Sequence, residues 1–263
     1  MSWRAYSSGS RHGPFNKGFP SPYIQPTSVV AAPIAPAALP GAPYDHFDFT
    51  DNSTVFNENT GTIQAGQGDT IVRVNNKGSH SQNLIDNSGT RATYDLAQIN
   101  GLNVALCTGL GVLSSNMILG LSGTGYSFAC VAQHTGVSTQ QAAIQWEVNR
   151  TIQQDELGSG NWEASVNSGP TVLDTGVAVT DGVWVGTVFS FDNSILFAAR
   201  ASGGALVTAT PASFFNPAAF EDFRVGLFDG QIAEVIVWDT RLSSAELLEV
   251  LAHFDGKYGV LPF

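Results

Sequence analysis

Two carboxylates, Glu234 and Asp239, lie close together in an apolar segment near the end of the chain. A pair of carboxylic acids flanking one glycosidic bond is the machinery of most glycoside hydrolases. Side chains of a strand alternate between its two faces, so a separation of five positions directs these two carboxylates to opposite sides. They cannot act on one bond, and we expect the protein not to be an enzyme.

The histidines also lack the spacing of a metal site, since no H-x-H or H-x-x-x-H pattern occurs. They are His12, His46, His80, His134 and His253. We therefore expect no metal ion. Neither a G-x-S-x-G motif, a P-loop nor a dinucleotide-binding motif is present, so no cofactor is expected. Glu234 is interpreted as a hydrogen-bonded partner of a backbone group or an arginine in a sheet.

A candidate glycan site surrounds Trp162, which follows the polar loop DELGSGN. Two interpretations remain open for this indole: packing in the core or against a partner, and stacking on a sugar ring. In the second case Asn161 and Glu163 would complete the site. Loops around residues 75–83 and 155–163 would then carry the recognition surface.

From residue 44 onward, short β-prone runs alternate with turn residues such as NNKGSHS, GLSGTG and ASGG. The runs cover residues 69–74, 102–107, 125–133, 142–148, 182–191, 194–200 and 205–210. Only 13% of the residues are charged while 43% are hydrophobic, which favours strands and a large core over solvated helices. The pattern predicts an antiparallel β-sandwich or jelly roll.

Several residues in these runs are expected in the core. Trp146 and Trp184 lie in apolar runs, and Cys107 and Cys130 lie in the apolar contexts VALCTG and SFACVA. Buried free thiols are the favoured interpretation of the cysteines, with a disulfide as the alternative.

The segment QIAEVIVW, residues 231–238, is apolar on both faces, which predicts a strand covered on both sides. One face carries Ile232, Ile236 and Trp238, and the other carries Ala233, Val235 and Val237.

A helix is predicted after this strand. Ser243 is its expected N-cap, and Glu246 completes a capping box. Leu242 and Leu247 form a hydrophobic staple, and Gly256 is expected to stop the helix.

Residues 1–43 form a Pro-, Ala- and Gly-rich arm that contains eight of the twelve prolines and cannot pair as a central strand. Its large apolar residues are candidate anchors for pockets on neighbouring subunits. They are Trp3, Tyr6, Phe15, Phe19, Tyr23 and Ile24. A disordered tail is the alternative interpretation of this segment.

Charge is divided unevenly between the arm and the body. The arm carries three bases and no acid, which leaves 22 acids against 8 bases in residues 44–263. An acidic body repels phosphate backbones, so no nucleic-acid partner is expected. The sequence also shows no export signal and no apolar run long enough for membrane insertion.

Two stretches resemble one known family. Residues 228–259, FDGQIAEVIVWDTRLSSAELLEVLAHFDGKYG, are similar to the closing strand and helix of concanavalin A-like (laminin G-like) jelly-roll domains of bacteria and their phages. Residues 47–102, from FDFTDNSTVF to NGL, resemble the opening of such domains in phage structural and tail-associated proteins. The chain departs from the pattern at LCTGLGVLSS, where relatives usually show an F-D-G-x-D-D turn.

The resemblance implies an all-β, concanavalin A-like jelly-roll sandwich over residues 44–263, with one short C-terminal helix. It further implies a structural virion protein of a tailed bacteriophage, either a capsid decoration or a tail or fibre component. Its expected partners are other virion proteins, reached through the arm, and further copies of itself. The alternative is a lectin-like carbohydrate-binding module on a bacterial or virion surface. A host surface glycan is compatible with both functions.

Overall fold

The computed structural model describes residues 38–86, 92–108, 113–117, 125–135, 141–146, 150–154, 160–166, 171–191, 197–210 and 221–259. Contacts divide the chain into two units, Met1–Ala32 and Pro33–Phe263, and all described residues belong to the second. The six candidate anchors, Trp3, Tyr6, Phe15, Phe19, Tyr23 and Ile24, lie outside the described residues. The clasping arm therefore stays a prediction.

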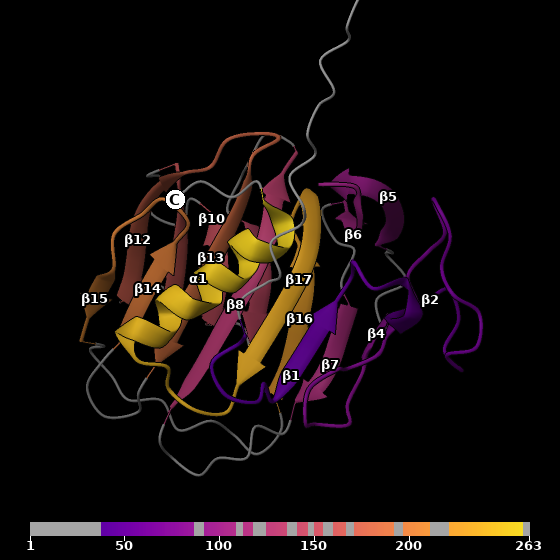
Figure 1. Ribbon diagram of the computed structural model, residues 1–263, viewed down its shortest axis with the longest axis horizontal. Helices are drawn as coiled ribbons and strands as arrows, with labels where there is room; N and C mark the ends of the chain where they lie inside the picture. Colours follow the sequence, from indigo (N-terminus) through magenta and orange to yellow (C-terminus); the bar gives the residue numbers. More distant parts are fainter. Residues whose placement is uncertain are drawn as a thin grey trace, which may run out of the picture. The chain divides into compact units, whose positions relative to one another are not determined.

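Two antiparallel sheets contain the described strands (Figure 1). Sheet A has the order β15-β14-β13-β8-β17-β6-β5, and β1 pairs with β17 beside this path. Its strands are β15 (Val207–Ala209), β14 (Phe197–Ala201), β13 (Trp184–Phe191), β8 (Tyr126–His134), β17 (Gly230–Trp238), β6 (Leu102–Cys107), β5 (Thr93–Ile99) and β1 (Asp45–Asp48).

Sheet B has the order β12-β11-β10-β9-β16-β7-β4-β3-β2. Its strands are β12 (Thr171–Ala178), β11 (Asn161–Val166), β10 (Arg150–Gln154), β9 (Gln141–Trp146), β16 (Glu221–Leu227), β7 (Leu113–Met117), β4 (Leu84–Asp86), β3 (Arg73–Val74) and β2 (Val55–Phe56). One turn of 3-10 helix, η1 (Asn52–Thr54), precedes β2.

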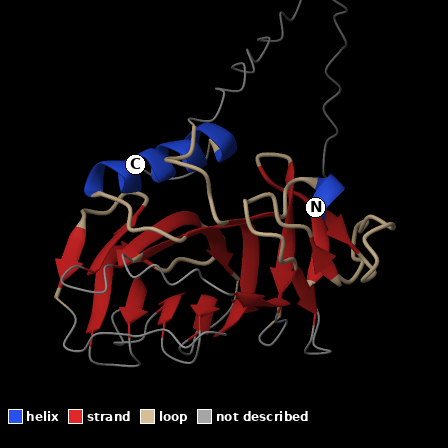
Figure 2. Cartoon of the chain, turned by 90° about the horizontal axis from the view of Figure 1, so that it is seen from below, coloured by secondary structure: helices blue, strands red, loops and turns tan. Residues whose placement is uncertain are grey.

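The sheets stack face to face, and the helix α1 (Ser244–Tyr258) covers the outer face of sheet A (Figure 2). Two layers of buried apolar side chains result. The core between the sheets includes Phe47, Phe128 and Phe223, whose rings stack with centroids 6.1 to 6.3 Å apart. A second core lies between sheet A and α1 and includes Trp184 and Leu247. The predicted all-β sandwich with one C-terminal helix is confirmed.

β17 is buried along its whole length, as predicted for a strand covered on both sides. Its pairing with β8 contains a bulge between Ile232 and Glu234, where Ala233 is the extra residue. The bulge shifts the alternation by one position, so Ile232 faces the core between the sheets and Ala233 faces α1. The predicted faces of these two residues were wrong. The others are confirmed: Val235 and Val237 lie between the sheets, and Ile236 and Trp238 lie under α1.

The predicted start of α1 is confirmed. Ser243 Oγ accepts a hydrogen bond from the backbone N–H of Glu246, and the Glu246 carboxylate accepts one from the Ser243 N–H at 2.7 Å. Leu242 and Leu247 are buried in the same apolar layer under the helix, where the staple places them.

The predicted end of α1 was wrong, because the helix continues through Gly256 to Tyr258. Gly259 is the residue that stops it, in the left-handed conformation with φ of 61°, and its N–H donates to the carbonyl of Asp255. A left-handed helix terminus favours glycine, so both Gly256 and Gly259 fit the end of the helix by residue type. The position of the left-handed residue decides between them. Among the described residues, no helix has the length and apolar character to span a bilayer.

Leu39 and Pro40, predicted as part of the arm, pack onto the body. Leu39 lies against the apolar layer under α1, and Pro40 is buried. The indole Nε1 of Trp238 donates a buried hydrogen bond of 2.9 Å to the Pro40 carbonyl. The root of the arm is therefore fixed to the central strand of sheet A.

Candidate functional site

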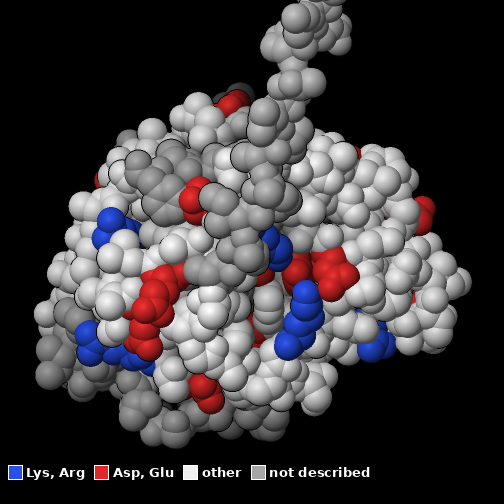
Figure 3. Space-filling model, viewed as in Figure 1, with Lys and Arg blue, Asp and Glu red and all other residues white. Residues whose placement is uncertain are grey.

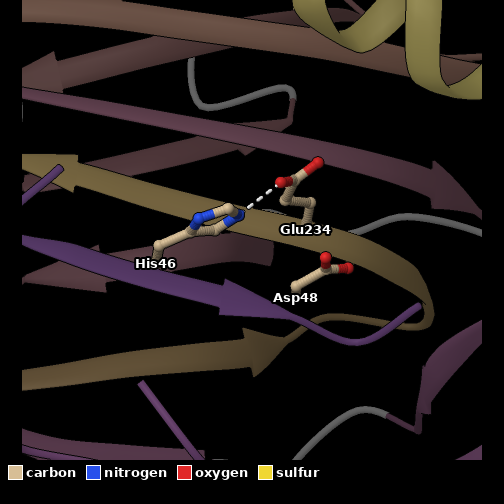
Figure 4. Close-up of side chains that lie close together, drawn as sticks. All are labelled: His46, Asp48 and Glu234. Atoms are coloured by element: carbon tan, nitrogen blue, oxygen red, sulfur yellow. Dashed lines mark hydrogen bonds and ion pairs between the residues drawn. The ribbon is translucent and has the colours of Figure 1, made fainter. Parts of the chain in front are cut away.

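β1 and β17 together build a buried cluster of ionisable side chains. His46 and Asp48 alternate with apolar residues along β1, so both point to the α1 side of sheet A, while Phe47 enters the core between the sheets. Antiparallel pairing sets Asp48 opposite Glu234 of β17. The three side chains converge, as Figure 4 shows, although Glu234 follows His46 by 188 positions.

Glu234 is fully buried and is surrounded by hydrogen-bond donors. His46 Nε2 lies 2.5 Å from its Oε1, and the Tyr258 hydroxyl donates to its Oε2 at 2.7 Å. Lys257 Nζ lies 3.1 Å from Oε2, and His253 Nε2 lies 3.8 Å from Oε1. The expectation that Glu234 is a hydrogen-bonded structural residue is confirmed, but its partners are side chains of β1 and α1 rather than an arginine.

Asp48 is held by two lysines from different elements. Lys257 of α1 and Lys77 of the loop before β4 place their Nζ atoms 2.9 and 3.0 Å from Asp48 Oδ2. The Thr50 hydroxyl donates to Oδ1 at 2.6 Å, and Lys77 also contacts Asp51 at 3.1 Å. The cluster thus connects β1, β17, α1 and one loop through charged contacts.

The cluster shifts the pKa of its members in opposite directions. Burial alone would raise the pKa of Glu234, but His253, His46 and the charge of Lys257 outweigh it and hold the pKa well below its usual value. At Asp48, burial and the charge of Glu234 raise the pKa, whereas Lys257 and the Thr50 hydroxyl lower it. The net result is a lowered pKa. Burial, together with the neighbouring carboxylates, raises the pKa of Tyr258 well above its usual value.

His46, Asp48 and Glu234 offer three ligand atoms within 4.8 Å of one another, so a metal ion must be considered. The Lys257 ammonium, however, contacts both carboxylates and stands where a cation would bind. The 2.5 Å distance between His46 Nε2 and Glu234 Oε1 is also shorter than the distance between two ligand atoms of one zinc ion. The arrangement fits a self-neutralised structural cluster.

A second polar network lies on the other face of β1, beneath residues 75–83. Asp45 is fully buried and accepts a hydrogen bond from the side-chain amide of Asn76, while its Oδ1 lies 3.1 Å from His80 Nδ1. His80 stacks on Tyr44 with ring centroids 4.5 Å apart. Burial raises the pKa of Asp45, although His80 and Asn76 oppose that shift.

Residues 75–83, predicted as a loop of the glycan surface, form a strap along the free edge of β1, and a role in glycan recognition stays a prediction. The N–H groups of Lys77 and His80 donate to the carbonyls of His46 and Tyr44 at 2.8 and 2.9 Å. A Cβ on Gly78 would lie 2.4 Å from the Tyr44 carbonyl oxygen, so only glycine allows this close approach. The strap satisfies backbone groups that an edge strand would expose.

The three residues nominated around Trp162 lie on β11. Trp162 is 1% exposed and belongs to the core between the sheets, so stacking of its indole on a surface sugar is contradicted, and core packing is confirmed. Glu163 is fully buried. Asn161 is half-buried and donates to the Asp174 carboxylate at 3.0 Å.

The other core assignments can be checked in part. Trp184 is 7% exposed and lies in the layer under α1, as predicted, whereas the side chain of Trp146 lies outside the described residues. Cys107 and Cys130 are buried free thiols, which confirms the favoured interpretation over a disulfide.

A row of polar residues crosses the outer face of sheet B, which no described helix covers (Figure 2). In register, Ser114 lies beside Arg224 and Arg224 beside Gln145. Residues adjacent to this row along the strands face the core between the sheets: Leu113, Val225 and Ile144. Alternation therefore directs Arg224 and Gln145, both half-buried, away from that core.

Comparisons with known proteins support the fold. No protein-family model and no curated protein matches the sequence. Domain 4 of an extracellular GH43 arabinanase from Geobacillus stearothermophilus, solved in complex with arabinotriose, matches with a TM-score of 0.52 and 18% identity, over 80% of this chain and 98% of that one. The receptor-binding domain of botulinum neurotoxin mosaic serotype C/D matches with a TM-score of 0.55 and 8% identity, over 81% of this chain and 51% of that one. The similarity establishes a β-sandwich of this general kind.

Proposed function

We propose that this chain is a non-catalytic, carbohydrate-binding β-sandwich module that uses the outer face of sheet B. The observation that carries the proposal is the polar row Ser114, Arg224 and Gln145, which crosses three neighbouring strands. Strands in a sheet lie about 4.8 Å apart, so the row extends over roughly 10 Å. A ligand matched to it is rich in hydrogen-bonding groups, as a sugar is.

The chemistry of the face favours a neutral oligosaccharide. Arg224 offers several N–H donors and Gln145 offers both a donor and an acceptor, which suits hydroxyl groups. Residues 44–263 carry 22 acids against 8 bases, so the body repels polyanions at long range. The fold similarity to an arabinanase domain in complex with arabinotriose is compatible with this ligand class.

The carboxylate pair in the buried cluster is not accessible to a substrate, which supports a binding role rather than hydrolysis. The two acids that β1 and β17 bring together, Asp48 and Glu234, are 4% and 0% exposed and are neutralised by Lys257. A general acid or nucleophile must reach its substrate, which these carboxylates do not. That the protein is not an enzyme nevertheless stays a prediction.

Titration with neutral oligosaccharides, including arabinotriose, tests the proposal by calorimetry after a glycan array. Arg224→Ala and Gln145→Ala should weaken binding, by about 10- to 150-fold for a lost hydrogen bond to the charged guanidinium. Leu248→Ala is the matched control, because this side chain is 45% exposed on α1, on the opposite side of the sandwich. No binding to any glycan at millimolar concentration, or equal loss in the control, contradicts the proposal.

A second candidate function is assembly into a tailed-phage virion, which the resemblance of residues 47–102 and 228–259 suggests and with which the sequence of residues 1–43 is compatible. Six large apolar side chains interrupt a proline-rich segment there, and the segment has the opposite net charge to the body. Since Leu39 and Pro40 pack onto the body, the informative truncation removes residues 2–37. It should abolish incorporation into particles without changing the thermal unfolding of the body. Normal incorporation of the truncated chain contradicts this function.

A further inference from the structure

Three asparagines are exposed in the part of the chain that the structure describes: Asn52, Asn59 and Asn100. An exposed asparagine can modify itself without an enzyme, because the backbone nitrogen of the next residue can attack its side-chain carbonyl carbon. The attack requires that this next N–H is not held in a hydrogen bond. The three sites differ in this respect.

The N–H groups that follow Asn52 and Asn59 are held by carboxylates. The Ser53 N–H donates to an aspartate at 3.0 Å, and the Thr60 N–H donates to the preceding glutamate at 2.6 Å. Each N–H must lose this bond before its nitrogen can attack. The fold therefore protects both asparagines, although both are exposed.

The N–H of Gly101, which follows Asn100, is not held in this way. The two residues form the turn between β5 and β6, which the pair Ile99 and Leu102 closes. Their φ angles are both positive, 48° and 79°, as in a type I′ turn, where the closing pair makes the backbone hydrogen bond. Across the described ranges, no hydrogen bond uses the Gly101 N–H or the Asn100 carboxamide.

Gly101 also leaves the attacking nitrogen open to approach. A Cβ at this position would meet nothing within 4 Å beyond its chain neighbours. The described glycines that follow an aspartate lie in other surroundings. The Gly182 N–H donates to the His134 carbonyl at 2.9 Å, Gly230 is buried in β17, and Gly256 lies within α1. The structure thus singles out the turn at Asn100.

We propose that Asn100 is a self-modification site of the folded protein, at which the carboxamide is converted to a carboxylate. The Gly101 nitrogen bonds to Asn100 Cγ, the Cγ–Nδ2 bond breaks, and ammonia leaves with the proton that the nitrogen has lost. Water then opens the resulting cyclic imide at one of its two carbonyl carbons. One opening gives aspartate, and the other gives isoaspartate, in which the main chain runs through the side-chain carbon.

The new carboxylate would lie beside the end of α1. Asn100 Nδ2 lies 3.6 Å from the position of a Cβ on Gly259, the residue that stops the helix. The C-terminal end of a helix carries partial negative charge, which repels a carboxylate. Ile99 is 1% exposed in the apolar layer under α1, so the turn and the helix share one core. Conversion should therefore loosen the end of α1 that carries Lys257 and Tyr258.

Incubation of the full chain at mildly alkaline pH tests the site, because base removes the amide proton. Peptides are then analysed by mass spectrometry and with isoaspartyl methyltransferase. In native protein, we expect the peptide containing Asn100 to gain the mass difference between a carboxamide and a carboxylic acid and to become methylated. The peptides containing Asn52 and Asn59 should stay unchanged and are the matched internal controls.

The same incubation in guanidinium chloride gives the rate for the unfolded chain. If Asn100 stays intact in native protein while the unfolded chain loses it, the fold protects the turn and the proposal is overturned. Equal conversion of all three asparagines in native protein also contradicts it, because exposure alone would then decide. Asn100→Gln should abolish the mass gain and the methylation, and their persistence in this variant would place the reaction elsewhere.

Asn100→Asp carries the carboxylate from the start and measures its effect on the helix. Its melting temperature should lie about 1 to 4 °C below that of fresh wild type. The difference should shrink at high salt, which screens the exposed charge. An unchanged melting temperature contradicts the position of the carboxylate against the end of α1. The site lies on sheet A, so none of these outcomes depends on glycan binding by sheet B.

Discussion

Replacement of Glu234 by glutamine tests whether the buried cluster holds α1 and β1 onto sheet A. The substitution keeps the shape of the side chain but removes the charge that His46, Tyr258 and Lys257 surround. Breaking one partner of a buried charged pair costs about 3 to 5 kcal/mol. For a domain of 150 to 250 residues, each kcal/mol lowers the melting temperature by about 2 to 4 °C, so we expect a decrease of about 6 to 20 °C.

The assay is equilibrium unfolding in urea, followed by tryptophan fluorescence, with a thermal scan beside it. Glu249→Gln is the matched control, because Glu249 is exposed on α1, and it should change the free energy of unfolding by less than about 0.5 kcal/mol. A loss below about 1 kcal/mol for Glu234→Gln would refute the argument. The double variant Glu234→Gln/Lys257→Met should be less destabilised than the sum of the single variants, because the two charges compensate each other.

Three further outcomes follow from the structure. The pKa of Glu234 is depressed in the folded state, so the ionised carboxylate stabilises the fold fully above its usual pKa of 4.5. This stabilisation is lost as the pH falls through the folded-state pKa. The difference in unfolding free energy between wild type and Glu234→Gln should therefore shrink as the pH of the unfolding series is lowered. Gly78→Ala should destabilise the domain by about 1 to 3 kcal/mol in urea unfolding, since its Cβ would lie 2.4 Å from the Tyr44 carbonyl oxygen; an unchanged midpoint contradicts the role of the strap. Burial raises the pKa of the Cys107 thiol to about 12, and Cys130 is also buried, so neither should react with a thiol reagent until the protein unfolds; fast labelling of native protein contradicts this.

Local sequence signals predicted the elements whose interactions are local. The capping box of Ser243 and Glu246 lies within four residues, and the burial of both faces of β17 follows from its largely apolar sequence, in which Gln231 and Glu234 are the polar residues. The bulge at Ala233 was not predictable in this way, because it arises from how β17 pairs with β8. Trp162 follows a polar loop, yet its position in the alternation of β11 directs it into the core.

The ionisable cluster was missed because its members are assembled by strand pairing. His46 and Glu234 are 188 positions apart, and no local motif connects them. The pattern Asp-His-Phe-Asp at residues 45–48 was the available signal, because it places a histidine and a carboxylate on one face of a strand. Recognising its partner required knowing that this strand pairs with β17.

The fixation of the arm root determines how the domain resists mechanical tension. A pull on the chain before Leu39 is first resisted by the hydrogen bond from Trp238 to the Pro40 carbonyl, and then by β1, which β17 and the strap hold on both edges. When the pull runs along the strand axis, the backbone bonds of β1 are loaded in shear and must break together. The N-terminal connection therefore opposes such a pull as one unit rather than bond by bond.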